Sequence, residues 1–249
     1  MLLILVILLI TVGILVVGAV WVVVRAQQAA DALATARTGV STVRADLIEG
    51  RTAEAAQQLA VVQGDTTRAV QATSDPVFAL ASAIPVLGTT PAAVRDVADA
   101  ADALAQQALP DLLVAGIALS PDALRADGRQ LNLEAFETAS PALDSAEQSL
   151  SAISEDVAGI DTAGTPAQVE DAVVSLQGQL DDALAETRTA AQGAALVPPM
   201  LGADGKRSYL LALQSNNEAR GTGGFFGSFG IFSAEARLMA ARSDASSLA

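Results

Sequence analysis

The chain has 249 residues, and its 28 acidic against 14 basic side chains give a formal net charge of −14. Such a surface disfavours nucleic acid and anionic lipid headgroups, because both are bound through clustered Lys and Arg. The sequence has no Cys and no His, which excludes disulfides, thiolate nucleophiles, imidazole bases and Cys or His zinc sites. We therefore expect no nucleic-acid partner, no cofactor and no metal site.

The N-terminal segment, residues 1–25, is a predicted membrane anchor. Residues 2–24 contain no charged side chain, and a helix of that length spans a hydrocarbon core of about 30 Å. A cleaved signal peptide has a shorter apolar stretch after a basic start, and a buried core helix is shorter or has a polar face. Trp21 suits the membrane interface, and Arg25 ends the apolar run. Membrane lipid is thus the expected partner of residues 2–24.

The orientation of this anchor depends on the charges beside it. Arg25, Arg37 and Arg44 follow the span, and the positive-inside rule alone would place the body in the cytoplasm. Acidic residues are mixed among these arginines, and the chain starts abruptly on its apolar run, as expected if a basic leader is missing. We therefore favour a single-pass plasma-membrane protein whose body is extracytoplasmic.

Residues 26–200 are predicted to form an Ala-rich helical bundle or stalk. Their apolar residues recur three and four positions apart, a coiled-coil-like pattern that marks helix faces packed on one another. Because aromatic residues make up only 3% of the chain, thin and closely packed helices are expected. The five packing faces are Leu33, Ala36, Val40, Val43 and Leu47; Ala55, Leu59, Val62, Thr66 and Ala69; Val94, Val97, Ala101, Leu104 and Ala108; Leu133, Phe136, Ser140, Leu143, Leu150, Ile153, Val157 and Ile160; and Val169, Val173, Leu176, Leu180 and Leu184.

Prolines and caps set the expected ends of these helices. Thr90 and Thr165 each precede a proline and are predicted N-caps. Pro110 should kink or restart its helix. The last long helix is predicted to end before Pro198 and Pro199. Such helices make antiparallel hairpins in an elongated bundle, although the same faces could instead pair with a second copy of the chain.

Residues 201–249 have a different character and are predicted to be an incomplete β motif. Tyr209–Leu213 is typical of a strand buried on both faces, and Phe225–Phe232 of a second strand. The predicted fold class is therefore mainly α, with one N-terminal transmembrane helix, an antiparallel bundle and a small C-terminal β-hairpin.

The polar, Gly-rich connection between these strands is the predicted binding site. Backbone N–H groups of such a loop can converge on an anion, and Arg220 could pair bidentately with a phosphate or carboxylate. Glu218 could hold Arg220 or a metal; the alternative is a turn fixed by its own side chains. The segment matches neither a P-loop nor a dinucleotide fingerprint, and no catalytic residue is predicted. The candidate binding residues are Gln214, Asn216, Asn217, Glu218, Arg220, Gly221, Thr222, Gly223 and Gly224.

The stretch YLLALQSNNEARGTGGFFGSFGIF, residues 209–232, resembles the hallmark of the domain-of-unknown-function family numbered 4012. The resemblance implies a membrane-anchored envelope protein, mainly of actinobacteria, loosely tied to surface-polysaccharide genes. Two departures stand out. Glu235-Ala236 replaces the family's usual Asp/Asn-Gly turn, and the family's β-rich domain continues past the position of Ala249. A C-terminally truncated member, poorly ordered from about Arg242, is therefore expected.

Three functions remain open on the sequence. The leading hypothesis is an interaction or assembly protein of the cell envelope, with an envelope protein or glycan as partner. The second is the remnant of an enzyme, because strand, Arg-bearing loop and strand resemble the start of the LytR-CpsA-Psr glycan phosphotransferases. The third is a helical sensor ectodomain, which would need a partner for cytoplasmic output.

Overall fold

The computed structural model describes residues 2–84, 88–126, 130–215 and 225–235. Its helices are α1 (Leu2–Ile48), α2 (Thr52–Thr73), α3 (Pro76–Ser82), α4 (Thr89–Ala103), the π-helical η1 (Leu104–Ala108), α5 (Leu109–Ala118), α6 (Glu134–Ala158) and α7 (Ala167–Met200). Its strands are β1 (Arg125–Ala126), β2 (Gln130–Leu131), β3 (Arg207–Ser215) and β4 (Phe225–Ala234), paired as two antiparallel hairpins.

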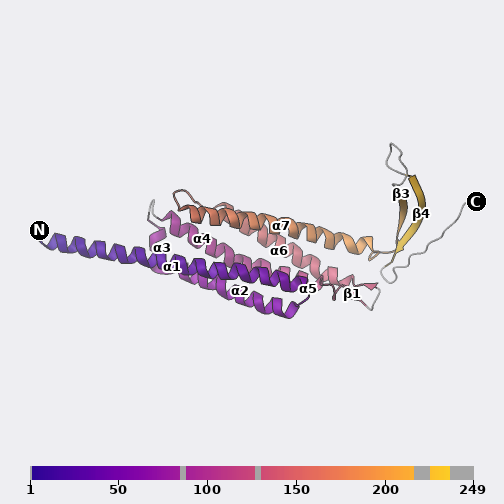
Figure 1. Cartoon of the computed structure of the whole chain (residues 1–249), viewed down its shortest axis with the longest axis horizontal. Coiled ribbons are helices and arrows are strands. Elements are labelled where there is room, and N and C mark those ends of the chain that lie inside the picture. The colour runs from indigo at the N-terminus through magenta and orange to yellow at the C-terminus, as the bar shows by residue number, and fades with distance from the viewer. Residues whose placement is uncertain (1, 85–87, 127–129, 216–224, 236–249) are drawn as a thin grey trace, which may run out of the picture.

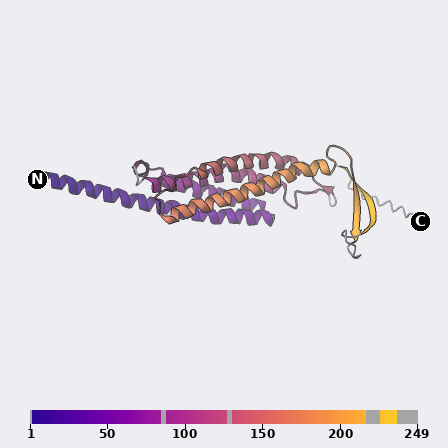
Figure 2. The same ribbon diagram turned by 90° about the horizontal axis from the view of Figure 1, so that it is seen from above.

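The long helices form a rod in which successive helices run in opposite directions (Figure 1). α1 pairs with α2 and α6 with α7, while the α4–η1–α5 run contacts both pairs. The N-terminal part of α1 projects alone from one end of the rod, and the β3–β4 hairpin lies at the other end, as Figure 2 also shows. This arrangement confirms the predicted fold class.

The projecting helix is the structural counterpart of the predicted anchor. Within the described part of the chain, α1 is the one helix long and apolar enough to cross a membrane, judged by length and composition. Residues 2–21 rise about 30 Å at 1.5 Å per residue, which matches a hydrocarbon core. Of the α1 side chains whose burial is described, Ala29 is the first that is fully buried by the neighbouring helices.

Small side chains make the core of the rod, as the composition predicted. All five residues of the second packing face lie buried: Ala55, Leu59, Val62, Thr66 and Ala69. Ala29, Ala32, Ala69, Ala72 and Ala98 form an all-alanine cluster where α1, α2 and α4 meet. Helices that meet through alanine can approach closely, but each alanine buries little apolar area. The core is therefore stabilised by many small contacts along the length of the rod.

The π-turn η1 lies directly before Pro110 and shows how the third packing face accommodates this proline. Proline lacks an N–H and its ring clashes with the carbonyl four residues earlier, so a regular helix cannot pass unchanged. The N–H of Leu109 instead donates to Leu104 O, five residues back. Gln63 Nε2 of α2 donates to Ala105 O at 3.0 Å, so a neighbouring helix supports the widened turn.

Three predicted helix ends are wrong. The N-cap positions of α4 and α7 are Gly88 and Pro166, which have no polar side chain, so Thr90 and Thr165 do not cap them. α7 also continues through Pro198 and Pro199 to Met200. Prolines are tolerated there because the helix is nearly finished: Leu201 N donates to Val197 O and Ala203 N to Pro198 O, which closes the last turn.

Candidate functional site

The β3–β4 hairpin frames the predicted binding loop. Its register pairs Arg207 with Ala234 at the base and Ser215 with Phe225 at the tip. A bulge between Leu213 and Gln214 shifts the register near the tip, and bulges re-aim the residues that follow them. The strands thus bring the two ends of the loop side by side.

Most of the predicted binding residues lie outside the described residues. Of the nine, the structure gives the backbone of Gln214 alone, which pairs with Phe226 in the sheet. Asn216, Asn217, Glu218, Arg220, Gly221, Thr222, Gly223 and Gly224 fall in the undescribed segment 216–224. Their proposed contacts with an anion or a metal therefore stay a prediction. Ala236 and the tail containing Arg242 also lie outside the described residues.

One face of the hairpin, here called the outer face, presents an exposed apolar patch beside the Ser208–Ser233 pair at the base. It consists of Leu210 and Ala212 of β3 opposite Ile231 and Phe229 of β4. Leu210 and Phe229 are both 72% exposed and Ile231 is 62% exposed. The prediction of a strand buried on both faces is therefore wrong for β3 in this structure, because no described element covers the outer face.

The opposite face of the hairpin is fastened to the end of α7 only at its base, and Leu211 and Leu213 of that face are 53% and 66% exposed. Tyr209 Oη donates a hydrogen bond to Met200 O at 2.6 Å, and the Tyr209 and Phe232 rings lie 6.3 Å apart across the strands. Gly202 has φ of 88° and lies so close to β4 that a Cβ atom there would stand 2.7 Å from Ala234 O. A side chain at this turn would push the hairpin off the rod.

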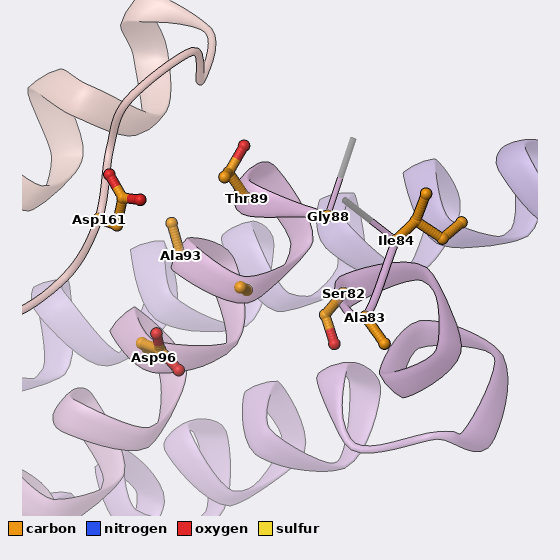
Figure 3. A pocket seen from close by; sticks show the side chains of 9 residues that line it. Ser82, Ala83, Ile84, Gly88, Thr89, Ala93, Asp96 and Asp161 are labelled. Atoms are coloured by element: carbon orange, nitrogen blue, oxygen red, sulfur yellow. The ribbon is translucent and has the colours of Figure 1, made fainter. Parts of the chain in front are cut away.

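A cavity of about 290 Å³ lies at the end of the rod from which α1 projects (Figure 3). It is lined by the end of α3, the start of α4 and Asp161 of the α6–α7 turn. Figure 3 shows the carboxylates of Asp96 and Asp161 on one side and Ser82 and Ile84 on the other. Asp161 Oδ1 accepts a hydrogen bond from Ala163 N at 2.9 Å, so this carboxylate shapes its own turn.

A second hollow, of about 530 Å³, continues along α4 and α6. It is acidic, with Asp96, Asp99, Glu155 and Asp156 among its lining residues. Burial raises the pKa of Asp99; the charge of Arg95 opposes this effect, and neighbouring carboxylates reinforce it. Among the residues described, no three His, Cys, Asp or Glu side chains form a group that could hold a metal ion.

A junction that the sequence analysis missed lies beside the cavity, where α1 enters the rod. Asp75 Oδ2 accepts hydrogen bonds from Trp21 Nε1 at 2.7 Å and from Arg25 Nε at 3.2 Å. Asp75 Oδ1 caps α3 by accepting from the N–H groups of Val77 and Phe78. The Arg25 guanidinium also lies 4.9 Å from the Trp21 ring centroid, a cation–π distance.

The sequence contains half of the signal for this junction. A Ser-Asp-Pro step before an apolar stretch is a helix-start pattern, and it makes Asp75 an N-cap candidate. Its partners Trp21 and Arg25 lie at least fifty positions away, so only the folded chain shows that the cap of α3 also binds the end of the apolar run.

Comparisons of the chain with protein-family models, with curated proteins and with solved structures found no match.

Proposed function

We propose that this chain is a single-pass plasma-membrane protein of the cell envelope with an extracytoplasmic body. Its role is interaction or assembly linked to surface polysaccharide or the cell wall. The helical rod presents the hairpin and its Asn-Asn-x-Glu-x-Arg loop to an envelope protein or glycan.

The exposed outer face of the hairpin is the observation that supports this proposal most. Apolar patches rimmed by polar residues mark contact surfaces in soluble protein regions. Leu210, Phe229 and Ile231 form such a patch, and the loop of predicted binding residues leaves the same hairpin. The α7 helix, at 1.5 Å per residue, holds this hairpin about 50 Å from the end where α1 projects.

A capture experiment on envelope fractions tests the role. The full-length chain in detergent should retain a defined envelope protein or glycan, and Phe229→Ser should abolish its recovery. Val174→Ser is the matched control, because Val174 is 66% exposed near the start of α7, about 40 Å along the helix from Met200 and the hairpin. Equal recovery with both variants would contradict the proposed contact surface.

The side of the membrane on which the body lies is tested separately. Topology reporters fused after Gly50 and after Gly202 should both report a location outside the cytoplasm, and a cytoplasmic signal at both would end the envelope proposal. Transfer of a labelled lipid-linked glycan by the purified chain, lost in Arg220→Ala, would instead favour the phosphotransferase hypothesis.

A further inference from the structure

We propose that α3 is a second membrane contact, whose apolar outer side lies in the headgroup–acyl boundary of the bilayer that α1 crosses. This inference rests on the membrane-anchored part of the proposed function. It adds a surface that the anchor itself does not require.

The composition around α3 is unusual for a surface helix. Residues 76–94 contain no charged side chain, and this is the longest uncharged stretch after the N-terminal apolar run. Phe78 is fully buried and fixes α3 to the rod, whereas Leu80 is 76% exposed and Val77 and Ile84 are each nearly half exposed. A helix on a water-facing surface has the reverse pattern, with polar residues outward.

The position of α3 indicates that the bilayer covers its exposed apolar side. α3 contacts α1 and α4, and Figure 1 shows it beside α1 where the projecting helix enters the rod. If residues 2–21 fill the hydrocarbon core, the interface falls at Trp21 and Arg25, the usual residues of that layer. Asp75, which caps α3, is hydrogen-bonded to both of these side chains.

Apolar side chains are also exposed on α1 at the level of this junction. Val20, Val23 and Val24 are between 43% and 58% exposed on α1, at the level where Trp21 bonds the start of α3. Short apolar helices in this layer bury their outer side by roughly 5–10 Å into the headgroup–acyl boundary. The bilayer that receives α1 is thus within reach of Val77, Leu80 and Ile84.

The charge around the junction defines the kind of lipid surface. Arg25 is paired with Asp75, and the adjacent cavity presents Asp96 and Asp161. These acids leave no net positive charge to attract anionic headgroups. The contact is therefore apolar in origin, and a zwitterionic phosphatidylcholine bilayer should suffice for it.

Depth measurements on the full chain in phosphatidylcholine nanodiscs test the inference. The sequence has no Cys, so single nitroxide labels can be placed at Leu80→Cys, Val16→Cys and Ile48→Cys without background. Ile48 is 72% exposed and stands about 40 Å further along α1 than Trp21, so it is the matched aqueous control. Collisions with oxygen and with a water-soluble nickel complex report the depth of each label.

We expect the Leu80→Cys label, like the Val16→Cys label, to collide more often with oxygen than with the nickel complex. The Ile48→Cys label should remain accessible to the nickel complex. A lipid-like Val16→Cys label with a Leu80→Cys label as aqueous as Ile48→Cys would overturn the α3 contact alone. Aqueous labels at both Val16→Cys and Leu80→Cys would overturn the anchor itself. Dipolar broadening between Leu80→Cys labels of two copies in one disc would assign the surface to self-association and also overturn the contact.

Discussion

Gly39 of α1 lies so close to Val62 of α2 that a Cβ atom on Gly39 would stand 2.5 Å from Val62 Cγ2. Real Cβ atoms do not approach that closely, and Val62 is almost fully buried. The α1–α2 pair therefore depends on a missing side chain at one position.

Replacing Gly39 by alanine should destabilise the folded chain by about 1–3 kcal/mol, the usual cost of overpacking. Gly64→Ala is the control, because a Cβ atom there would meet no other described atom within 4 Å. That change should stabilise the α2 helix by about 0.5–1 kcal/mol through helix propensity. Denaturant unfolding of both variants in detergent measures the change in the free energy of unfolding. A change of the same sign in both variants would contradict the close α1–α2 packing.

The core between α6 and α7 predicts a larger loss. Leu150 is fully buried among Ile153, Leu180 and Leu184. Leu150→Ala should cost about 2–5 kcal/mol, because it removes buried apolar surface and leaves a cavity. Leu196→Ala, on the exposed side of α7, should change the free energy of unfolding by less than about 0.5 kcal/mol. A similar melting curve for both variants would mean that α6 and α7 do not pack as described.

The junction of α1 and α3 predicts an acid-induced change. Hydrogen bonds from Phe78 N and Trp21 Nε1, then from Val77 N, with the charge of Arg25, hold the pKa of Asp75 below its ordinary value of 3.8. The folded junction therefore binds protons less readily than the unfolded chain. Its stabilisation is complete above pH 3.8 and is lost as the pH falls through the lowered pKa.

Trp21 is the only tryptophan in the chain, so its fluorescence reports this titration directly. The parent chain should show an emission change with a midpoint below pH 3.8, and Asp75→Asn should lack it. The same transition in both proteins would assign the signal to another group.

The attachment of the hairpin predicts a change in proteolysis. Lys206 is the only lysine and lies between α7 and β3, so endoproteinase Lys-C can cut the chain at one place. Tyr209→Phe removes the hydrogen bond to Met200 O, a net loss of about 0.5–1.5 kcal/mol, and should raise the cleavage rate about two- to tenfold. Ser208→Ala, whose hydroxyl contact with Ser233 is long at 3.4 Å, should leave the rate unchanged.

The helical part of the fold was predictable because its signal is local and repeated. Leu59 and Val62 recur at helical spacing, and the structure buries both. The strand around Phe229 was predictable from its aromatic residues, and the strand around Tyr209 from its short continuous apolar run. Whether other elements cover those strands was not predictable. Burial depends on segments from elsewhere in the chain, and the sequence of β3 is the same whether or not they pack on it.

The remaining differences come from contacts between distant residues. The hydrogen bond between Trp21 and Asp75 joins positions 54 apart, and no local pattern encodes it. The π-turn before Pro110 was expected only as an unspecified kink, since a helix can accommodate a proline in several ways, and the supporting hydrogen bond from Gln63 comes from another helix. The binding loop was singled out by its residue types alone, and the described strands locate only its two ends.

The alternation of the long helices has a consequence for what the hairpin can meet. Three passes, α1, the α4–α5 run and α7, run in one direction and two, α2 and α6, run in the other, so the β3–β4 hairpin lies at the opposite end of the rod from the N-terminal part of α1. Under the proposed membrane anchoring, a partner rooted in the same bilayer would have to extend roughly 50 Å from it to reach the hairpin. On this proposal, the length of the rod favours partners that project far from the membrane over those that lie close to its surface.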